Sequence, residues 1–187
     1  MFIRKLGCDS ICIEIGIGDN PGVAGNRIVP AKEEARLAAI RRYDVLDTPP
    51  DGAFDRITSM AARLFGVPIA IISIVDHDRI WFKSHHGLEA TEIGRDPGLC
   101  ASAILGTGAY VVSDARNDPR TLANPLVAGE MGLQFYAAAP LTTSDGHNLG
   151  TLCVLDTLPR EVTGEEMQIL SDLADRKSTR LNSSHSS

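Results

Sequence analysis

The segment from residue 132 to residue 160 constrains the fold of this chain most. Two apolar stretches, 133–141 and 149–155, flank a short polar sequence that contains Asp145-Gly146. Because glycine readily adopts the positive φ of a tight hairpin turn, this pattern predicts two adjacent antiparallel strands. The first strand carries three consecutive alanines, Ala137 to Ala139. Such small side chains leave room for a covering helix or a small ligand to approach the sheet.

Helices are predicted on both sides of this hairpin in the sequence. Residues 30–42 begin with proline and acidic residues and end with two arginines, which suits both ends of a helix dipole. Residues 51–65 carry apolar side chains at intervals of three and four and stop at Gly66. A last helix is predicted to start at the capping box Thr163 to Glu166 and to continue to about residue 174.

Further strands are predicted between these helices. The β-branched run 67–75 is typical of a central strand that is covered on both faces. Residues 80–86 form the returning strand, and regular alternation places Trp81, Lys83 and His85 on one of its faces. A short helix over 97–105, a brief strand over 110–113 and a helical stretch over 125–131 precede the hairpin. The fold class is therefore α+β: a central antiparallel sheet, profilin-like or PAS-like, with N- and C-terminal helices packed on it.

Both ends of the chain differ in character from its centre. Residues 1–29 are rich in glycine and show no sustained periodicity, so we expect a poorly ordered leader. Residues 175–187 interrupt the last amphipathic helix and resemble a translated sequencing adapter, so we expect a non-native or disordered tail. The predicted domain is residues 30–174. We expect the natural protein to continue into an output domain.

Composition excludes several classes of function. The net charge is −6 and aromatic residues make up 5% of the chain, which disfavours nucleic-acid binding. No apolar run reaches the roughly 20 residues that span a bilayer. The four cysteines are sparse, as is typical of reduced thiols in a cytoplasmic protein. The sequence also lacks a catalytic motif, so we expect no enzymatic activity from the chain.

Few individual residues carry chemistry. Cys100 lies near the start of a predicted helix, where the dipole lowers a thiol pKa, but its apolar neighbours favour a packed core thiol over a redox sensor. Cys153 is predicted to be a core residue. His85 and His86 are adjacent in a strand and so point to opposite faces, and we predict no metal site.

Other residues keep two interpretations open. Trp81 could stack on a ligand or a partner subunit, or pack beneath the loop after its strand. Asp114 lies in a loop of alternating charge that could form a pocket rim, although a salt-bridged loop is favoured. Tyr136 has a polar tip that needs a partner if it is buried, and it must point away from Phe135.

Several motifs together resemble the GAF domains of bacterial signalling proteins. They are YDVLDTPPDGAFDRIT, IAIISIVDHDRIWFKSHHGL, LQFYAAAPL and DGHNLGTLCVLDTLPREVTGEE. The resemblance implies a sensory or regulatory module that precedes a histidine kinase or diguanylate cyclase domain. It also implies a ligand pocket over one face of the sheet and a homodimer through the terminal helices. We expect Leu37, Ile40, Met167 and Leu170 to form that dimer contact.

The resemblance places candidate pocket residues at Trp81, His85, Cys100, Asp114, Tyr136 and Ala138. It names no cofactor, and the motifs of cyclic-nucleotide-binding and bilin-binding GAF domains are absent from the sequence. Two alternatives stay open. One is a dimerisation domain without a ligand, and the other is a small thiol-dependent reductase, which requires a second thiol close to Cys100.

Overall fold

The computed structural model describes residues 29–183, and side chains are described to Ser178. The predicted leader therefore lies outside the described residues, apart from Val29. The elements in chain order are α1 (Glu33–Tyr43), α2 (Gly52–Phe65), β1 (Ile69–Val75), β2 (Arg79–His86), β3 (Glu92–Gly94), α3 (Leu99–Ala103), β4 (Tyr110–Val112), α4 (Pro125–Ala128), β5 (Phe135–Thr142), β6 (Asn148–Asp156) and α5 (Gly164–Ser183).

The sheet has six strands in the order β3-β2-β1-β6-β5-β4, and every neighbouring pair is antiparallel. The predicted hairpin forms β5 and β6, and Gly146 has a φ of 83° in its turn. All seven residues of β1 are buried, as its continuous apolar run predicts. The α+β prediction is confirmed, and β3 is the one strand in the described residues that sequence reasoning did not predict.

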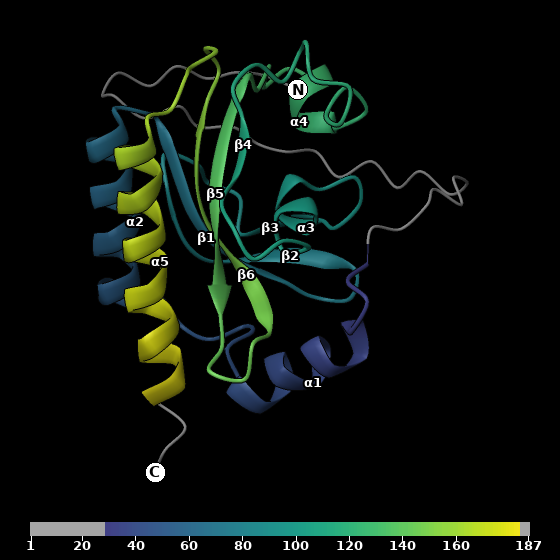
Figure 1. Ribbon diagram of the computed structural model, residues 1–187, viewed down its shortest axis with the longest axis vertical. Helices are drawn as coiled ribbons and strands as arrows, with labels where there is room; N and C mark the ends of the chain where they lie inside the picture. The colour runs from purple at the N-terminus through teal and green to yellow at the C-terminus, as the bar shows by residue number, and fades with distance from the viewer. Residues whose placement is uncertain (1–28, 184–187) are drawn as a thin grey trace.

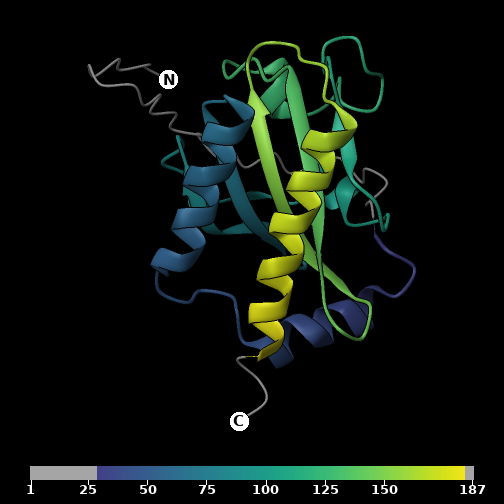
Figure 2. The ribbon, with the colours of Figure 1, turned by 60° about the vertical axis from the view of Figure 1, so that its left-hand side comes forward.

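Different helices cover the two faces of the sheet (Figures 1 and 2). Helices α2 and α5 pack on one face over a first core, which includes Phe54, Ile72 and Leu152. Helices α3 and α4 and their loops lie over a second core on the other face, which includes Phe82 and Tyr136. Phe135 and Tyr136 thus point to opposite faces, as predicted.

The alanines of β5 serve close helix packing. Ala137 and Ala139 belong to the first core together with Leu170 and Ala174 of α5, and all four are almost completely buried. Their small side chains allow the α5 backbone to approach the sheet. The sequence left open whether these small side chains make room for a covering helix or for a ligand. At Ala137 and Ala139 they make room for the helix α5.

Helices α2 and α5 are joined by polar contacts at both ends of the pair. Arg160, just before α5, donates from Nη1 to the carbonyl oxygen of Phe65 at the end of α2 and forms an ion pair with Glu166. Lys177 donates from Nζ to the carbonyl oxygen of Ala53, near the start of α2, at 2.7 Å. We call these contacts the two clamps. They show that α2 and α5 run antiparallel.

The last helix extends beyond the predicted domain boundary. Sequence reasoning placed its end at about Ala174, whereas α5 continues to Ser183. Lys177 is 6% exposed and its Nζ lies 4.6 Å from the ring centre of Phe54. The origin of residues 175–187 stays a prediction, but the first of them take part in packing in this structure. The capping box itself forms as predicted, with reciprocal hydrogen bonds between Thr163 and Glu166.

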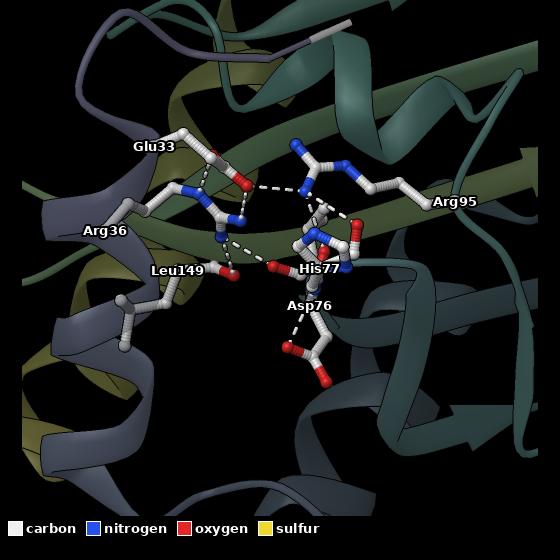
Figure 3. Close-up of polar contacts among 7 residues, drawn as sticks. Glu33, Arg36, Asp76, His77, Arg95 and Leu149 are labelled. Carbon is white, nitrogen blue, oxygen red and sulfur yellow. Dashed lines mark hydrogen bonds and ion pairs between the residues drawn. The ribbon is translucent and has the colours of Figure 1, made fainter. Parts of the chain in front are cut away.

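A buried charged cluster ties α1 to the end of the sheet (Figure 3). Glu33 binds both Arg36 and Arg95, and the two guanidinium groups are almost fully buried. Arg36 also donates to the carbonyl oxygen of Val75, and Arg95 donates to that of Asp76. The cluster therefore fixes α1 against the β1–β2 turn. Sequence reasoning singled out neither arginine.

A β-bulge in β2 changes which side chains share a face. Ile72 pairs with Ser84 and Ser73 pairs with Phe82, so Lys83 is an extra residue. Lys83 Nζ lies 5.9 Å from the ring centre of Trp81 on the α2 side. Ser84 also faces α2.

The regular alternation predicted for Trp81, Lys83 and His85 is therefore wrong for His85. Ser84 Oγ lies 3.0 Å from Thr58 Oγ1, and His86 Nδ1 lies 3.5 Å from Ser59 Oγ; both partners are in α2. His85, between Ser84 and His86, must then point to the opposite face. The bulge is the physical reason, because it moves every later side chain by one position.

The predicted dimer contact also needs correction. Ile40 is 1% exposed and Leu170 is 0% exposed, and both lie in the first core. Leu37 and Met167 pack against the same core. These side chains complete the interior of one chain, so Ile40 and Leu170 have no surface left to offer a second copy.

Candidate functional site

A small, largely buried cavity lies between the sheet and the α3–α4 layer. Its volume is about 20 Å³, which is room for roughly one water-sized molecule. The walls are mostly apolar and come from β1, β2, β3, α3, α4, β5, β6 and the loops between them. The lining residues are Ile71, Phe82, Leu88, Ile93, Leu99, Cys100, Leu126, Met131, Tyr136, Cys153 and Leu155.

Two thiols and one phenol supply the polar atoms of this cavity. The Tyr136 hydroxyl donates to Cys100 Sγ at 3.2 Å, and both residues are buried. Cys153 lines the same cavity and donates to the carbonyl oxygen of Ile71 at 3.6 Å. Both cysteines are free thiols. The cavity therefore holds a buried dithiol with one hydroxyl directed at it.

Local sequence explains why these groups meet. Gly98 precedes α3, and Cys100 is the second residue of that helix. Ala101 and Ala103 have no bulk, so the short helix sits close to the sheet. Cys153 lies at the centre of β6, where its Cα pairs with Ile71 on one side and Ala138 on the other.

The two thiols differ in acidity because their surroundings differ. Hydrogen bonding from the Cys153 thiol, supported by Tyr136, Ser73 and Thr151, outweighs burial and lowers the pKa of Cys100 to about 6. Burial raises the pKa of Cys153 well above its usual value, and the neighbouring Cys100 adds to this rise. Burial likewise raises the pKa of Tyr136. Cys100 is thus the thiol that ionises first.

The structure divides the predicted pocket residues among several places. Cys100 and Tyr136 line the small cavity. Ala138 is buried in the second core, where it pairs with Tyr110 and Cys153, but the cavity wall beside it is formed by larger side chains.

Asp114 faces its own loop. It accepts hydrogen bonds from the Arg116 backbone N–H at 3.2 Å and from Asn117 Nδ2 at 2.7 Å. Two residues further on, Asp118 forms an ion pair with Arg120. The ion pair fits the salt-bridged interpretation of this loop, and Asp114 lines neither the small cavity nor the cleft around Trp81. Its role at a pocket rim stays a prediction.

Trp81 and His85 line a separate, open cleft of about 530 Å³. Strand β3 pairs with β2 only from Arg79 to Trp81, so the later residues of β2 lie at the edge of the sheet. Side chains from both faces of β2 therefore reach the cleft. Lys83 crosses it and donates to Thr48 Oγ1 at 2.7 Å and to the carbonyl oxygen of Pro49 at 2.8 Å. Trp81 is only 8% exposed and belongs to the first core, so it offers little ring surface for stacking.

Sequence reasoning missed part of the cavity. Cys153 was predicted to be a core residue, which is confirmed, and its proximity to Cys100 was left open as the condition for the reductase alternative. Leu126 and Met131 of the α4 region were not singled out at all. The sequence signal for these two residues was weak. The cap residue Asn124 indicates where α4 starts, but only the position of α4 over the sheet shows that this region lines the cavity.

Within residues 29–183, the structure holds no cluster of three or more histidine, cysteine, aspartate or glutamate side chains that could bind a metal ion. The described helices also include none that is long and apolar enough to cross a membrane.

A search of protein families matches residues 49–181 to the family described as GAF domain. The chain belongs to the GAF domain family. The resemblance drawn from the sequence motifs is thereby confirmed, and the α+β architecture described above is the GAF fold.

A curated relative supports the link to signalling. A cyclic di-GMP phosphodiesterase of Pseudomonas aeruginosa is 45% identical over 131 residues, which are 70% of this chain and 22% of that protein. The chain thus spans about a fifth of that relative's length. A GAF domain with this kinship is a signalling-type sensor domain, as the sequence analysis predicted.

Solved structures share the fold at low sequence identity. A type II free methionine-R-sulfoxide reductase from Thermoplasma acidophilum aligns with a TM-score of 0.59 and 16% identity, covering 71% of this chain and 92% of that one. The GAF domain of a phosphoenolpyruvate-protein phosphotransferase from Acinetobacter aligns with a TM-score of 0.59 and 14% identity, covering 81% and 95%. The blue-light absorbing PixJ GAF domain from Thermosynechococcus elongatus aligns with a TM-score of 0.55 and 16% identity, covering 83% and 92%. At these identities the similarity shows the fold.

Proposed function

We propose that this GAF domain is the sensory module of a cytoplasmic cyclic di-GMP signalling protein and has no catalytic activity of its own. The observation that carries the proposal is the 45% identity with part of a cyclic di-GMP phosphodiesterase, in combination with a small cavity above the sheet. The free, buried thiols suit a reducing compartment. A cyclic di-GMP enzyme is favoured over a two-component kinase as the output domain.

The signal would pass from the cavity to the α2–α5 pair through the sheet. Cys153 and Leu155 of β6 line the cavity, whereas Leu152 and Val154 of the same strand pack in the first core under α5. A ligand that alters the position of β6 would therefore alter the packing of α5. This mechanism is a population shift between two packings, and the cavity favours one of them when it is filled.

A chimera tests this function. The chain would replace the matching segment of the Pseudomonas phosphodiesterase, and hydrolysis of cyclic di-GMP would be measured. Leu126→Phe narrows the cavity from a half-buried lining position, and Leu158→Phe places the same change at a side chain that is 66% exposed. We expect L126F to change the hydrolysis rate several-fold and L158F to leave it unchanged. Equal rates in the chimera and both variants would contradict the proposal.

The small volume of the cavity favours a second candidate, a dimerisation domain that binds no ligand. Met60 and Leu64 lie on the outer face of α2 and are 36% and 55% exposed, so they offer an apolar surface to a second copy of the chain. Light scattering separates the candidates. We expect Met60→Lys with Leu64→Glu to dissociate a dimer, whereas Leu158→Glu, another exposed leucine, should not. A monomeric wild-type chain would remove this candidate.

A further inference from the structure

The small cavity contains two sulfur atoms on separate elements of the fold. Cys100 is in α3 and Cys153 is in β6, and both side chains are buried against the same cavity. Because both thiols line one cavity of about 20 Å³, they lie close to one another. A disulfide between them would join the five-residue helix α3 to the central strand β6.

The surroundings give the two thiols different roles. Cys100 accepts a hydrogen bond from the Tyr136 hydroxyl, and a buried pair of hydroxyls, Ser73 and Thr151, lies beyond it with their oxygens 2.9 Å apart. Donors around Cys100 stabilise its thiolate, which is the nucleophilic form. Cys153 instead donates its thiol proton to the Ile71 carbonyl oxygen, at 3.6 Å. Cys100 is placed to react first and Cys153 to resolve the product.

The cavity selects for very small reagents. Its volume of about 20 Å³ accommodates roughly one molecule the size of water, and its lining consists of eleven apolar, aromatic or thiol side chains. Hydrogen peroxide is little larger than water and carries hydroxyl groups that match the Tyr136 hydroxyl. Organic hydroperoxides with aromatic groups are far too large to enter without opening the domain.

We propose that Cys100 and Cys153 form a peroxide-sensitive dithiol, which hydrogen peroxide converts to a disulfide inside the cavity. The proposal rests on the sensory function proposed above, because it names the signal that this cavity would receive.

The chemistry requires one peroxide and both thiols. The Cys100 thiolate attacks one peroxide oxygen, so that an S–O bond forms, the O–O bond breaks and hydroxide leaves to become water. The Cys153 sulfur then attacks the Cys100 sulfenic acid, so that the S–S bond forms and the S–O bond breaks. The departing hydroxide takes the Cys153 proton and leaves as a second water. Two thiols are oxidised and one peroxide is reduced to two waters.

The test uses the whole 187-residue chain with Cys8→Ser and Cys12→Ser, so that only the two cavity cysteines remain. The chain would be treated with hydrogen peroxide and, separately, with cumene hydroperoxide, and analysed by intact mass and peptide mapping. We expect hydrogen peroxide to remove two hydrogens and link the Cys100 and Cys153 peptides. Cumene hydroperoxide should react at least tenfold more slowly at equal concentration.

Single variants distinguish the roles of the thiols. In Cys153→Ser, dimedone should trap a sulfenic acid at Cys100. In Cys100→Ser, Cys153 should give no adduct on the same timescale. Tyr136→Phe keeps the ring and removes the hydroxyl, so we expect a rate reduced several-fold with an unchanged circular dichroism spectrum. Melting curves of every variant show whether the chain is folded.

Three outcomes would overturn the proposal. They are no disulfide in a folded chain, preferential adduct formation at Cys153, and equal rates with both peroxides, which would mean that oxidation requires unfolding. None of these three outcomes contradicts the proposed sensory function, because the L126F chimera tests that function separately. Conversely, a disulfide that forms while L126F and L158F chimeras hydrolyse cyclic di-GMP equally would support the chemistry and remove the link to signalling.

Discussion

Arg36 Nη1 lies 2.6 Å from the carbonyl oxygen of Val75, the last residue of the central strand β1. Arg36 belongs to α1, which precedes the region matched by the GAF family. The same guanidinium group binds Glu33, which in turn binds Arg95 before α3. A helix outside the family core is thus held on the sheet by a buried, charge-assisted network rather than by apolar packing alone.

Replacing Arg36 should therefore destabilise the domain. Arg36→Met leaves the Glu33 carboxylate with one partner fewer and removes the donor to Val75. We expect a loss of about 3 kcal/mol in the free energy of unfolding, as is typical when one member of a buried ion pair is removed. Arg41→Met changes an exposed arginine of the same helix and should stay within about 0.5 kcal/mol. Urea denaturation measures both, and equal values for the two variants would contradict the role given to Arg36.

Acid should weaken the same network. Burial raises the pKa of Glu33, but hydrogen bonds from Arg36 and Arg95 outweigh this effect and lower the pKa from 4.5 to about 2. A carboxyl group with a lowered folded pKa contributes stability above its unfolded pKa, and this contribution disappears as the pH falls through the folded value. We expect a loss on the order of 2 kcal/mol between pH 5 and pH 2, measured by urea titration at each pH. In Glu33→Gln this part of the pH dependence should be absent, and an unchanged profile would show that other groups cause it.

Gly150 should not tolerate a side chain. A Cβ atom at this position would lie 1.8 Å from the carbonyl oxygen of Ser73, on the neighbouring strand β1. Gly150→Ala must therefore separate β1 from β6, and we expect a loss of about 3 kcal/mol or more. Gly164→Ala is the matched control, because open space surrounds that position at the start of α5. It should be neutral or stabilise by up to about 1 kcal/mol. Thermal melts of the two variants that coincide would contradict the close strand contact.

The second clamp can be tested at Lys177. Lys177→Met keeps most of the apolar stem but removes the hydrogen bond to the Ala53 carbonyl oxygen and the cation over Phe54. We expect a loss of about 1–2 kcal/mol, because a buried carbonyl oxygen is left without this donor. Arg176→Met, at the exposed neighbouring position, should have no measurable effect. If the two variants melt at the same temperature, residues after 174 contribute nothing to the fold.

The reactivity of Cys100 should depend on pH. Hydrogen bonding from Cys153 and Tyr136 lowers its pKa to about 6, so the thiolate fraction rises between pH 5 and pH 7 and levels off above. The rate of reaction with hydrogen peroxide should follow this curve, increasing roughly tenfold over that interval. Tyr136→Phe removes one donor and should move the midpoint to higher pH. A midpoint near 9, the ordinary value for a cysteine, would show that the thiolate is not stabilised.

Much of the fold could be predicted because the decisive patterns are local. The β-branched run of β1, the Asp145-Gly146 turn and the capping box before α5 each specify one element without reference to the rest of the chain. Strand β3 escaped prediction because its three residues, Glu92 to Gly94, are too few to show a periodicity. They become a strand only by pairing with β2.

The site was harder to predict because it depends on contacts between distant segments. Nothing local to Lys83 shows that β1 pairs with β2 through a bulge there, yet this bulge decides the face of His85. Likewise, Cys100 and Cys153 each look like ordinary core residues in their own segments. Their proximity follows from the position of α3 over β6, which only the complete topology reveals.

The two clamps between α2 and α5 have a mechanical consequence. Arg160 holds one end of the helix pair and Lys177 the other, so neither helix can slide past its partner without breaking one of these two hydrogen bonds. A displacement of the sheet therefore reaches both helices together and leaves the domain as a tilt or rotation of the pair. A signal carried by this helix pair would thus be a torque rather than a change in helix length.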